Sequence, residues 1–181
     1  MENLNATALI VPVIALILII ILYMHLLKHS NNRSDFKRVS YFIVAFSFLP
    51  NFAWEMLQMP LFLNMSPGWK STLFCTLASV ADAIMVLLLY FVFATLYKQP
   101  FWIKHLNIQR ILLLIVIGGI GAILAELRHL SQDNWAYASS MPILPFINVG
   151  LLPVLQFMFL PVLSYYLSFY FLKKNYGSQT N

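Results

Sequence analysis

Three acidic residues lie inside long apolar segments of a chain that carries little charge. The 181 residues include six Asp and Glu, and Glu55, Asp82 and Glu126 are the three in apolar surroundings. An ionised acid at the centre of a bilayer costs about 2.5–3.5 kcal/mol on the insertion scale, so such acids usually mark function. A carboxyl enclosed by apolar walls can stay protonated and act as a general acid.

Polar residues accompany these acids at helical spacing. Residues that are three, four or seven positions apart share one helix face. This spacing groups Asn51 and Gln58 with Glu55, Ser79 and Cys75 with Asp82, and His129 with Glu126. Counted from the outer helix ends, the three acids and Asn51, Ser79 and Gln156 lie roughly 6–15 Å deep. We therefore expect one polar cavity between the helices, open toward the outer leaflet, above inner halves that are almost purely apolar.

The composition excludes a soluble domain, a disordered chain and a disulfide scaffold. Hydrophobic residues make up 61% of the chain and charged residues 9%, whereas soluble domains are about half apolar and a quarter charged. The single cysteine, Cys75, cannot form an internal disulfide. In a membrane protein, the net charge of +5 indicates how the chain is oriented in the membrane and does not indicate nucleic-acid binding.

The apolar segments predict an all-α membrane bundle in one domain, 1–181. A spanning helix needs about 20 apolar residues. We expect five spans, at about 6–27, 39–60, 72–97, 109–130 and 147–172. Nine of the eleven Lys and Arg then lie on one side, in 28–38, 98–110 and 173–174. The positive-inside rule places the N-terminus outside and the C-terminus in the cytoplasm. This describes a multi-pass integral protein of a bacterial inner membrane or, in a eukaryote, the endoplasmic reticulum.

Several of these features have a second interpretation. The outer loop 131–146, with Trp135 and Tyr137, is either a lid or part of an interfacial aromatic belt. Asn51 and Gln156 either bind substrate or hold helices together. The acids could also be near-surface carboxylates bonded to Arg128, His129 or water.

One pair of residues has the spacing of a metal-binding motif. Glu126 and His129 form an E-x-x-H pair, the spacing that di-iron helical bundles use twice. One copy is present, so we expect neither a metal nor another cofactor.

The second span carries the motif of a known family. Phe36-Lys37-Arg38-Val39-Ser40-Tyr41 is followed, after nine residues, by Asn51-Phe52-Ala53-Trp54-Glu55. This resembles the small integral-membrane terpene cyclases of fungal meroterpenoid and indole-diterpene pathways, in which a basic stretch and a Tyr precede N-x-A-W-E. The resemblance covers roughly 25 residues of the chain. It implies that Glu55 protonates an epoxide or olefin and starts cyclisation.

The family has about seven spans and a second acid in a late helix. This chain has about five expected spans and no acid in the last, so Asp82 or Glu126 would take the second role. The segments 135–142 and 150–153 also look like small bacterial membrane proteins of unassigned function.

We therefore expect an enzyme that protonates an isoprenoid or lipid-like substrate and cyclises or isomerises it, with Glu55, Asp82 and Glu126 as catalytic acids. The expected substrate-binding residues are Asn51, Trp54, Gln58, Ser79, His129, Trp135, Tyr137 and Gln156. The alternatives are a proton-coupled transporter or lipid carrier, since membrane acids can carry protons, and an accessory subunit of a larger complex. The expected partners are the bilayer and the apolar ligand, and a homo-oligomer is also compatible with the sequence.

Overall fold

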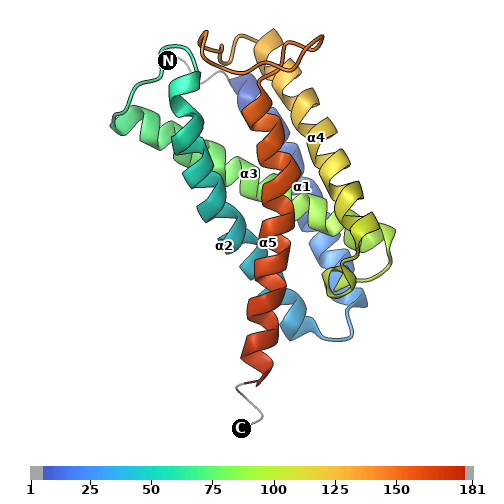
Figure 1. The fold of residues 1–181 in the computed structure, drawn as a ribbon. Coiled ribbons are helices and arrows are strands. Elements are labelled where there is room, and N and C mark those ends of the chain that lie inside the picture. Colours follow the sequence, from blue (N-terminus) through green and yellow to red (C-terminus); the bar gives the residue numbers. More distant parts are fainter. Residues whose placement is uncertain (1–5, 178–181) are drawn as a thin grey trace.

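The computed structural model describes residues 6–177, and side chains from 10 to 173. The described chain is all-helical and contains isolated β-bridges but no strand. Five long helices and two short 3-10 helices follow one another (Figure 1): α1 Ala6–His29, α2 Arg33–Gln58, η1 Met59–Leu61, α3 Trp69–Leu96, η2 Trp102–His105, α4 Ile108–Ser131 and α5 Leu151–Gly177. The expected fold class, an all-α bundle, is confirmed.

Four of the five long helices are long and apolar enough to cross a membrane. They are Ile10–His29, Trp69–Leu96, Ile108–Ser131 and Leu151–Lys173. The protein is thus a multi-pass integral membrane protein. Helix α2 is not among the four. Its first turns carry Arg33, Asp35, Lys37 and Arg38, and Asn51 and Glu55 lower its hydropathy further.

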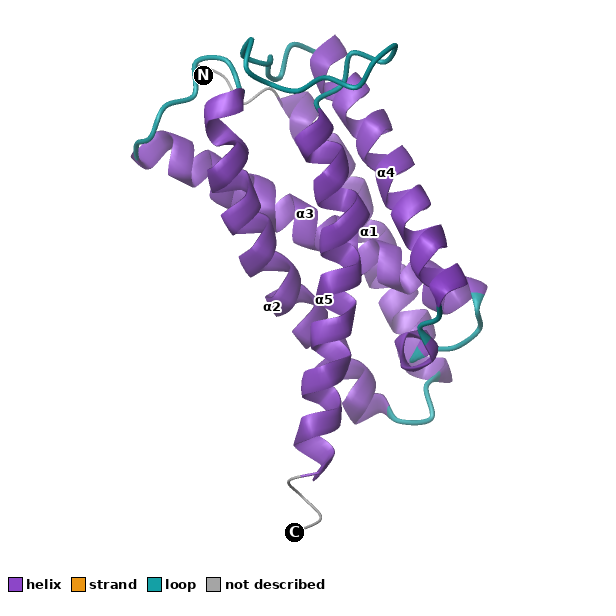
Figure 2. Ribbon diagram, in the orientation of Figure 1, coloured by secondary structure: helices purple, strands orange, loops and turns teal. Residues whose placement is uncertain are grey.

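The helices run up and down between two distinct ends of the bundle. The α1–α2 and α3–α4 connections lie at one end, with the C-terminal end of α5 (Figure 1). We call this the basic end, because the basic segments 28–38 and 98–110 lie there. The opposite end, which we call the capped end, carries loops 59–68 and 132–150 (Figure 2). Helix α2 packs against α3 and α5, α4 packs along α5, and α1 packs along α3.

Two helices begin four or more residues away from the predicted starts. Helix α2 begins at Arg33 and not at 39, because the Asn32 side chain accepts a hydrogen bond from the Asp35 backbone N–H at 3.1 Å and caps the helix. Helix α5 begins at Leu151 and not at 147. Phe146 and Asn148 adopt left-handed φ values of 70° and 57°, which a right-handed helix does not accommodate.

Prolines inside the helices free carbonyls that then contact neighbouring helices. Pro50 cannot donate to the Phe46 carbonyl, which instead accepts a 3.1 Å hydrogen bond from the Ser164 hydroxyl of α5. Pro161 likewise frees the Phe157 carbonyl. Gly118 of α4 lies directly against that group: a Cβ at this position would be 2.1 Å from the Phe157 oxygen. The small residue therefore permits the close approach of α4 to α5.

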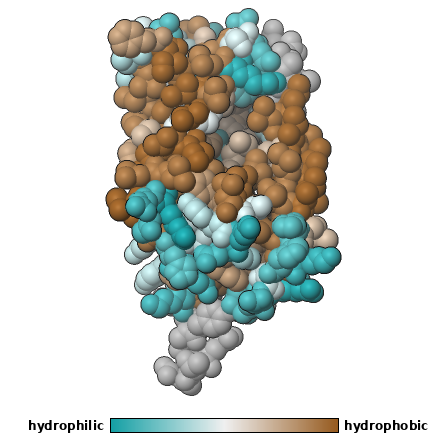
Figure 3. Space-filling view, turned by 90° about the vertical axis from the view of Figure 1, so that its right-hand side faces the viewer, coloured by the Kyte–Doolittle hydropathy of each residue, from teal (hydrophilic) through white to brown (hydrophobic). Residues whose placement is uncertain are grey.

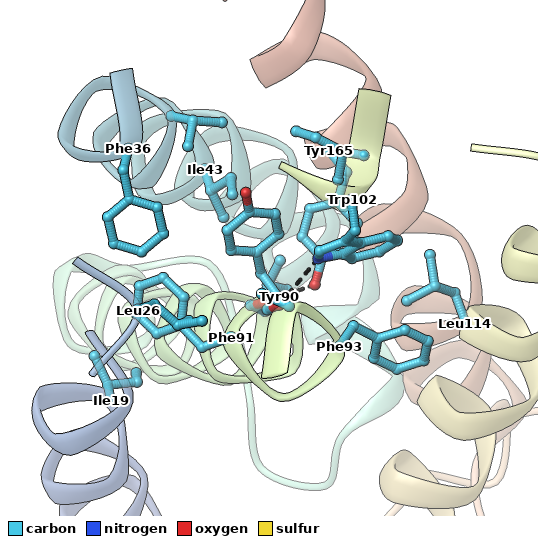
Figure 4. Packing of buried hydrophobic residues seen from close by; sticks show 14 of the residues in the cluster. Ile19, Leu26, Phe36, Ile43, Tyr90, Phe91, Phe93, Trp102, Leu114 and Tyr165 are labelled. Carbon is cyan, nitrogen blue, oxygen red and sulfur yellow. Dashed lines mark hydrogen bonds between the residues drawn. The ribbon is translucent and has the colours of Figure 1, made fainter. Parts of the chain in front are cut away.

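A dense aromatic cluster fills the bundle at the basic end (Figure 4). Tyr90, Trp102 and Tyr165 are each 0% exposed. Their polar atoms are satisfied by backbone: the Trp102 indole donates to the Tyr90 carbonyl at 3.1 Å, and the Tyr165 hydroxyl donates to the Val86 carbonyl at 2.7 Å. We call this cluster the basic-end core. It leaves the capped end as the place for a cavity.

Candidate functional site

A cavity of about 410 Å³ lies between the helices toward the capped end. It is lined by residues of all five long helices and of the two loops at that end. Figure 3 shows a hollow within the apolar surface on the side of the molecule that lies to the right in Figure 1. Most of the lining is apolar. Its polar members are Glu55, Gln58, Cys75, Asp82, Glu126, His129, Trp135 and Gln156.

The three acids reach this cavity from three different helices. Glu55 comes from α2, Asp82 from α3 and Glu126 from α4, and all three line the same space. The shared cavity that the sequence predicts for them is therefore present. Its lining holds carboxyl groups amid apolar side chains, an environment in which an isolated charge is costly.

Gln156 of α5 joins the first two acids. Its amide nitrogen lies 3.1 Å from Glu55 Oε1, 2.9 Å from Asp82 Oδ2 and 2.9 Å from Asn51 Oδ1. An amide group has two N–H donors for these three acceptors. Gln156 can therefore give full hydrogen bonds to two of the three at once, and Glu55 Oε1 has a second donor in Gln58 Nε2 at 2.8 Å.

The two carboxyls share one donor group. Gln156 Nε2 contacts an oxygen of each, at 3.1 Å for Glu55 and at 2.9 Å for Asp82. Two ionised carboxylates held around one amide in apolar surroundings would repel each other, so a proton on one of them relieves the repulsion. The geometry thus suits a pair of acids of which one is protonated and able to give up its proton.

Gln58 fixes the other side of Glu55. Its amide nitrogen donates to Glu55 Oε1 at 2.8 Å and to the Gln156 side-chain oxygen at 3.1 Å. The Trp54 indole donates to the Gln58 oxygen at 3.2 Å. These hydrogen bonds fix which end of the Gln58 and Gln156 amides is the nitrogen and which is the oxygen. Both side chains are neutral, so uncharged groups orient Glu55.

Glu126 is held by the loop of the capped end. It is 8% exposed and accepts hydrogen bonds from the Trp135 indole, at 3.2 Å, and from the Tyr137 hydroxyl. Burial, together with the adjacent Glu126 carboxylate, raises the pKa of Tyr137. The phenol therefore keeps its proton and remains the donor in this pair.

His129 extends the contact between α4 and the same loop. Its ring stacks on Trp135 with 4.1 Å between centroids, and its Nδ1 lies 2.9 Å from the Asn134 amide nitrogen. The loop also pairs with the α2–α3 connection. The Leu63 N–H donates to the Ala136 carbonyl at 2.8 Å, and the Ala138 N–H to the Leu61 carbonyl at 2.9 Å. The two loops together form a continuous cap over the cavity, which we call the cap.

Four of the predicted substrate-binding residues lie outside the cavity lining. Asn51 and Ser79 are buried, at 1% and 0% exposure, and Ser79 donates to the Cys75 carbonyl at 2.6 Å within its own helix. Trp54 and Tyr137 contact lining residues, namely Gln58 and Glu126. Asn51, Trp54 and Tyr137 thus hold side chains that line the cavity, whereas the Ser79 hydroxyl bonds within its own helix.

Sequence reasoning missed most of the apolar lining. Phe62, Phe74, Met85 and Phe157 line the cavity, but an apolar residue in an apolar span carries no signal of its own. Within residues 6–177, no group of three or more His, Cys, Asp and Glu side chains is arranged to hold a metal ion.

Comparison of the chain with protein-family models, with curated proteins and with solved structures found no match.

Proposed function

We propose that this protein is a membrane-embedded enzyme that protonates an isoprenoid or similar lipid and cyclises or isomerises it. The observation that carries the proposal is the Glu55–Asp82 pair, joined by Gln156 and lining a mostly apolar cavity. The motif at 51–55, with its resemblance to membrane terpene cyclases, supports the same assignment. An apolar substrate can reach such a cavity from the bilayer.

In the proposed reaction Glu55 supplies the proton. The Glu55 O–H bond breaks as a new C–H bond forms at an olefin, or an O–H bond forms at an epoxide, and a carbocation results. Attack by a second double bond, or a shift of the charge, forms the product skeleton. Loss of a proton from carbon to the Asp82 or Glu126 carboxylate completes the product, so cyclisation or isomerisation leaves the molecular formula unchanged. Aromatic faces stabilise cations through their quadrupoles, and Trp135 and Phe157 line this cavity.

The proposed membrane arrangement has five spans, an outer N-terminus and a cytoplasmic C-terminus. Helix α2 has 26 residues and packs between the apolar helices α3 and α5, which supports counting it as the fifth span. The basic end would then face the cytoplasm and the cap would face outward.

Thiol labelling tests this arrangement. In a Cys75→Ser background, Ser66→Cys in the cap should react with an impermeant reagent added outside intact cells, and Lys104→Cys at the basic end should react only after lysis. The reverse pattern would invert the orientation.

Replacement of Glu55 tests the chemistry. Glu55→Gln keeps the shape and hydrogen bonding but removes the transferable proton, and positioned acid catalysis contributes about 10²–10⁴-fold. We expect conversion of isoprenoid and epoxy-isoprenoid substrates by membranes to fall by that factor, while the matched control Asp133→Asn, an exposed acid in the loop, retains it.

The products report the mechanism directly. When the reaction is run in H₂O, the products should have the same mass as the substrate. After olefin protonation in D₂O they should carry one carbon-bound deuterium, read by mass spectrometry and NMR. Full turnover by Glu55→Gln would end the general-acid assignment. If none of the isoprenoid substrates reacts and the protein instead takes up a solute together with protons, the alternative function, a proton-coupled transporter, would be favoured.

A further inference from the structure

The ionisable groups that line the cavity are unequal in sign. Glu55, Asp82 and Glu126 contribute carboxyls, and Cys75 and His129 are the other titratable lining groups. Among the described lining residues none is Lys or Arg. A ligand with an anionic head would therefore meet only acids and a neutral wall, whereas a cationic head would find up to three carboxylates.

The remaining lining suits a long apolar chain. On α3 the lining residues extend from Phe74 to Val92, which corresponds to about 27 Å of helix. The volume of about 410 Å³ is within the ~300–1,000 Å³ of sites that enclose small organic ligands. The apolar wall therefore continues well beyond the level of Asp82 toward the basic end.

Aromatic rings lie at the same end of the cavity as the acids. Phe62 and Trp135, both from the cap, and Phe74 near the start of α3 line it. A cation over an aromatic face is attracted by the ring quadrupole, and the attraction grows when water is excluded. Carboxylates and rings together form a site complementary to one positive charge.

We propose that this cavity binds amphiphiles whose head is a protonated amine and whose tail is a long apolar chain, and that it excludes chains with anionic heads such as carboxylates or diphosphates. The inference rests on the proposed function in one respect: an ammonium ion places in the cavity the same charge as the carbocation of the proposed reaction. It also specifies the substrate, which must reach the acids with an uncharged head.

Three ligands with the same twelve-carbon chain test the selectivity. N,N-dimethyldodecylamine is cationic at neutral pH, dodecanol is uncharged and dodecanoate is anionic. Their binding to purified protein in nanodiscs would be measured by calorimetry and by tryptophan fluorescence, with empty nanodiscs as the reference for partitioning. We expect the amine to bind at least about tenfold more tightly than the alcohol, the factor that corresponds to 1.4 kcal/mol, and dodecanoate to show no saturable binding.

Variants locate the effect in the cavity. The double variant Glu55→Gln, Asp82→Asn should lose the preference for the amine while keeping the alcohol, and the matched control Asp133→Asn should change neither. Gly121 lines the cavity, and a Cβ there meets nothing within 4 Å. Gly121→Leu should therefore fill the space and weaken both ligands.

Protons and ammonium ions compete for the same carboxylates, so amine binding to the wild-type protein should weaken as the pH falls, while alcohol binding should change less. This measurement keeps the proposal testable if the double variant does not fold. An amine that binds no better than the alcohol, or a preference that survives in a folded double variant, would overturn the inference. Amine selectivity without turnover would remove only the enzymatic proposal, whereas turnover without amine selectivity would remove only this one.

Discussion

The two ends of the bundle differ in how their buried polar groups are hydrogen-bonded. In the basic-end core, the polar atoms of Trp102 and Tyr165 donate to single backbone carbonyls, and the side chains are fully buried. Near the capped end, three acceptors from two helices, α2 and α3, converge on one amide of Gln156. The first arrangement has one acceptor for each donor, and the second places three acceptors around the two N–H groups of Gln156.

This difference separates stability from function within one small bundle. Fully paired buried groups add rigidity, whereas acidic groups enclosed by apolar walls cost free energy. Proteins retain such costly groups where activity needs them. The comparison therefore predicts that the basic-end core contributes mainly stability, and that the cavity near the capped end contributes mainly chemistry.

The largest effect on stability is expected for Trp102→Ala. Trp102 packs with Phe93 and Tyr165 at centroid distances of 5.3 and 5.6 Å. Its loss should leave a cavity and lower the free energy of unfolding by about 3–5 kcal/mol. Chemical denaturation in micelles, followed by circular dichroism, measures the change.

The matched control for this substitution is Trp69→Ala, because the Trp69 side chain is 73% exposed and should contribute little to unfolding. Equal destabilisation by the two variants would contradict the division between the ends.

A smaller loss of stability is expected for Gly118→Ala. The new methyl group would lie 2.1 Å from the Phe157 carbonyl oxygen, so α4 must move away from α5. Overpacking of this kind typically costs about 1–3 kcal/mol. Gly121→Ala in the same helix is the control, since its Cβ meets nothing within 4 Å. Thermal unfolding of the pair should show a lower midpoint for Gly118→Ala alone, and matching midpoints would show that α4 tolerates displacement.

The elements of this fold were predictable from the sequence, and their exact limits were not. The five long apolar runs revealed all five long helices. The predicted helix starts were wrong where a local interaction outweighs hydropathy. Asn32 caps α2 before its apolar run begins. Phe146 and Asn148 adopt left-handed φ values, so α5 begins only after them. Neither signal is visible as a change in apolar content.

The site shows a similar division. Depth and helical face were enough to predict that Glu55, Asp82 and Glu126 share a cavity. They do not reveal which helices are neighbours, so the bridging role of Gln156, which packing alone decides, was not predicted. Asn51 and Ser79 have the right depth and face but lie behind the lining.

The smallest effect is expected where the cap meets the acids. Tyr137→Phe removes the hydroxyl that donates to Glu126 but keeps the ring that packs on Gly150, where a Cβ would lie 3.0 Å from the Tyr137 Cζ. A hydrogen bond to a charged acceptor contributes about 1.5–3 kcal/mol locally. Much of this loss should appear as easier opening of the loop and little as global unfolding, because Trp135 and the backbone bonds of Leu63 and Ala138 still hold it. Hydrogen–deuterium exchange should therefore speed up in 132–150 and stay unchanged in the basic-end core. Tyr166→Phe, at a side chain that is 60% exposed, serves as the control and should change neither region. Faster exchange in the core of Tyr137→Phe would show that the two ends open together and that the division between them is wrong.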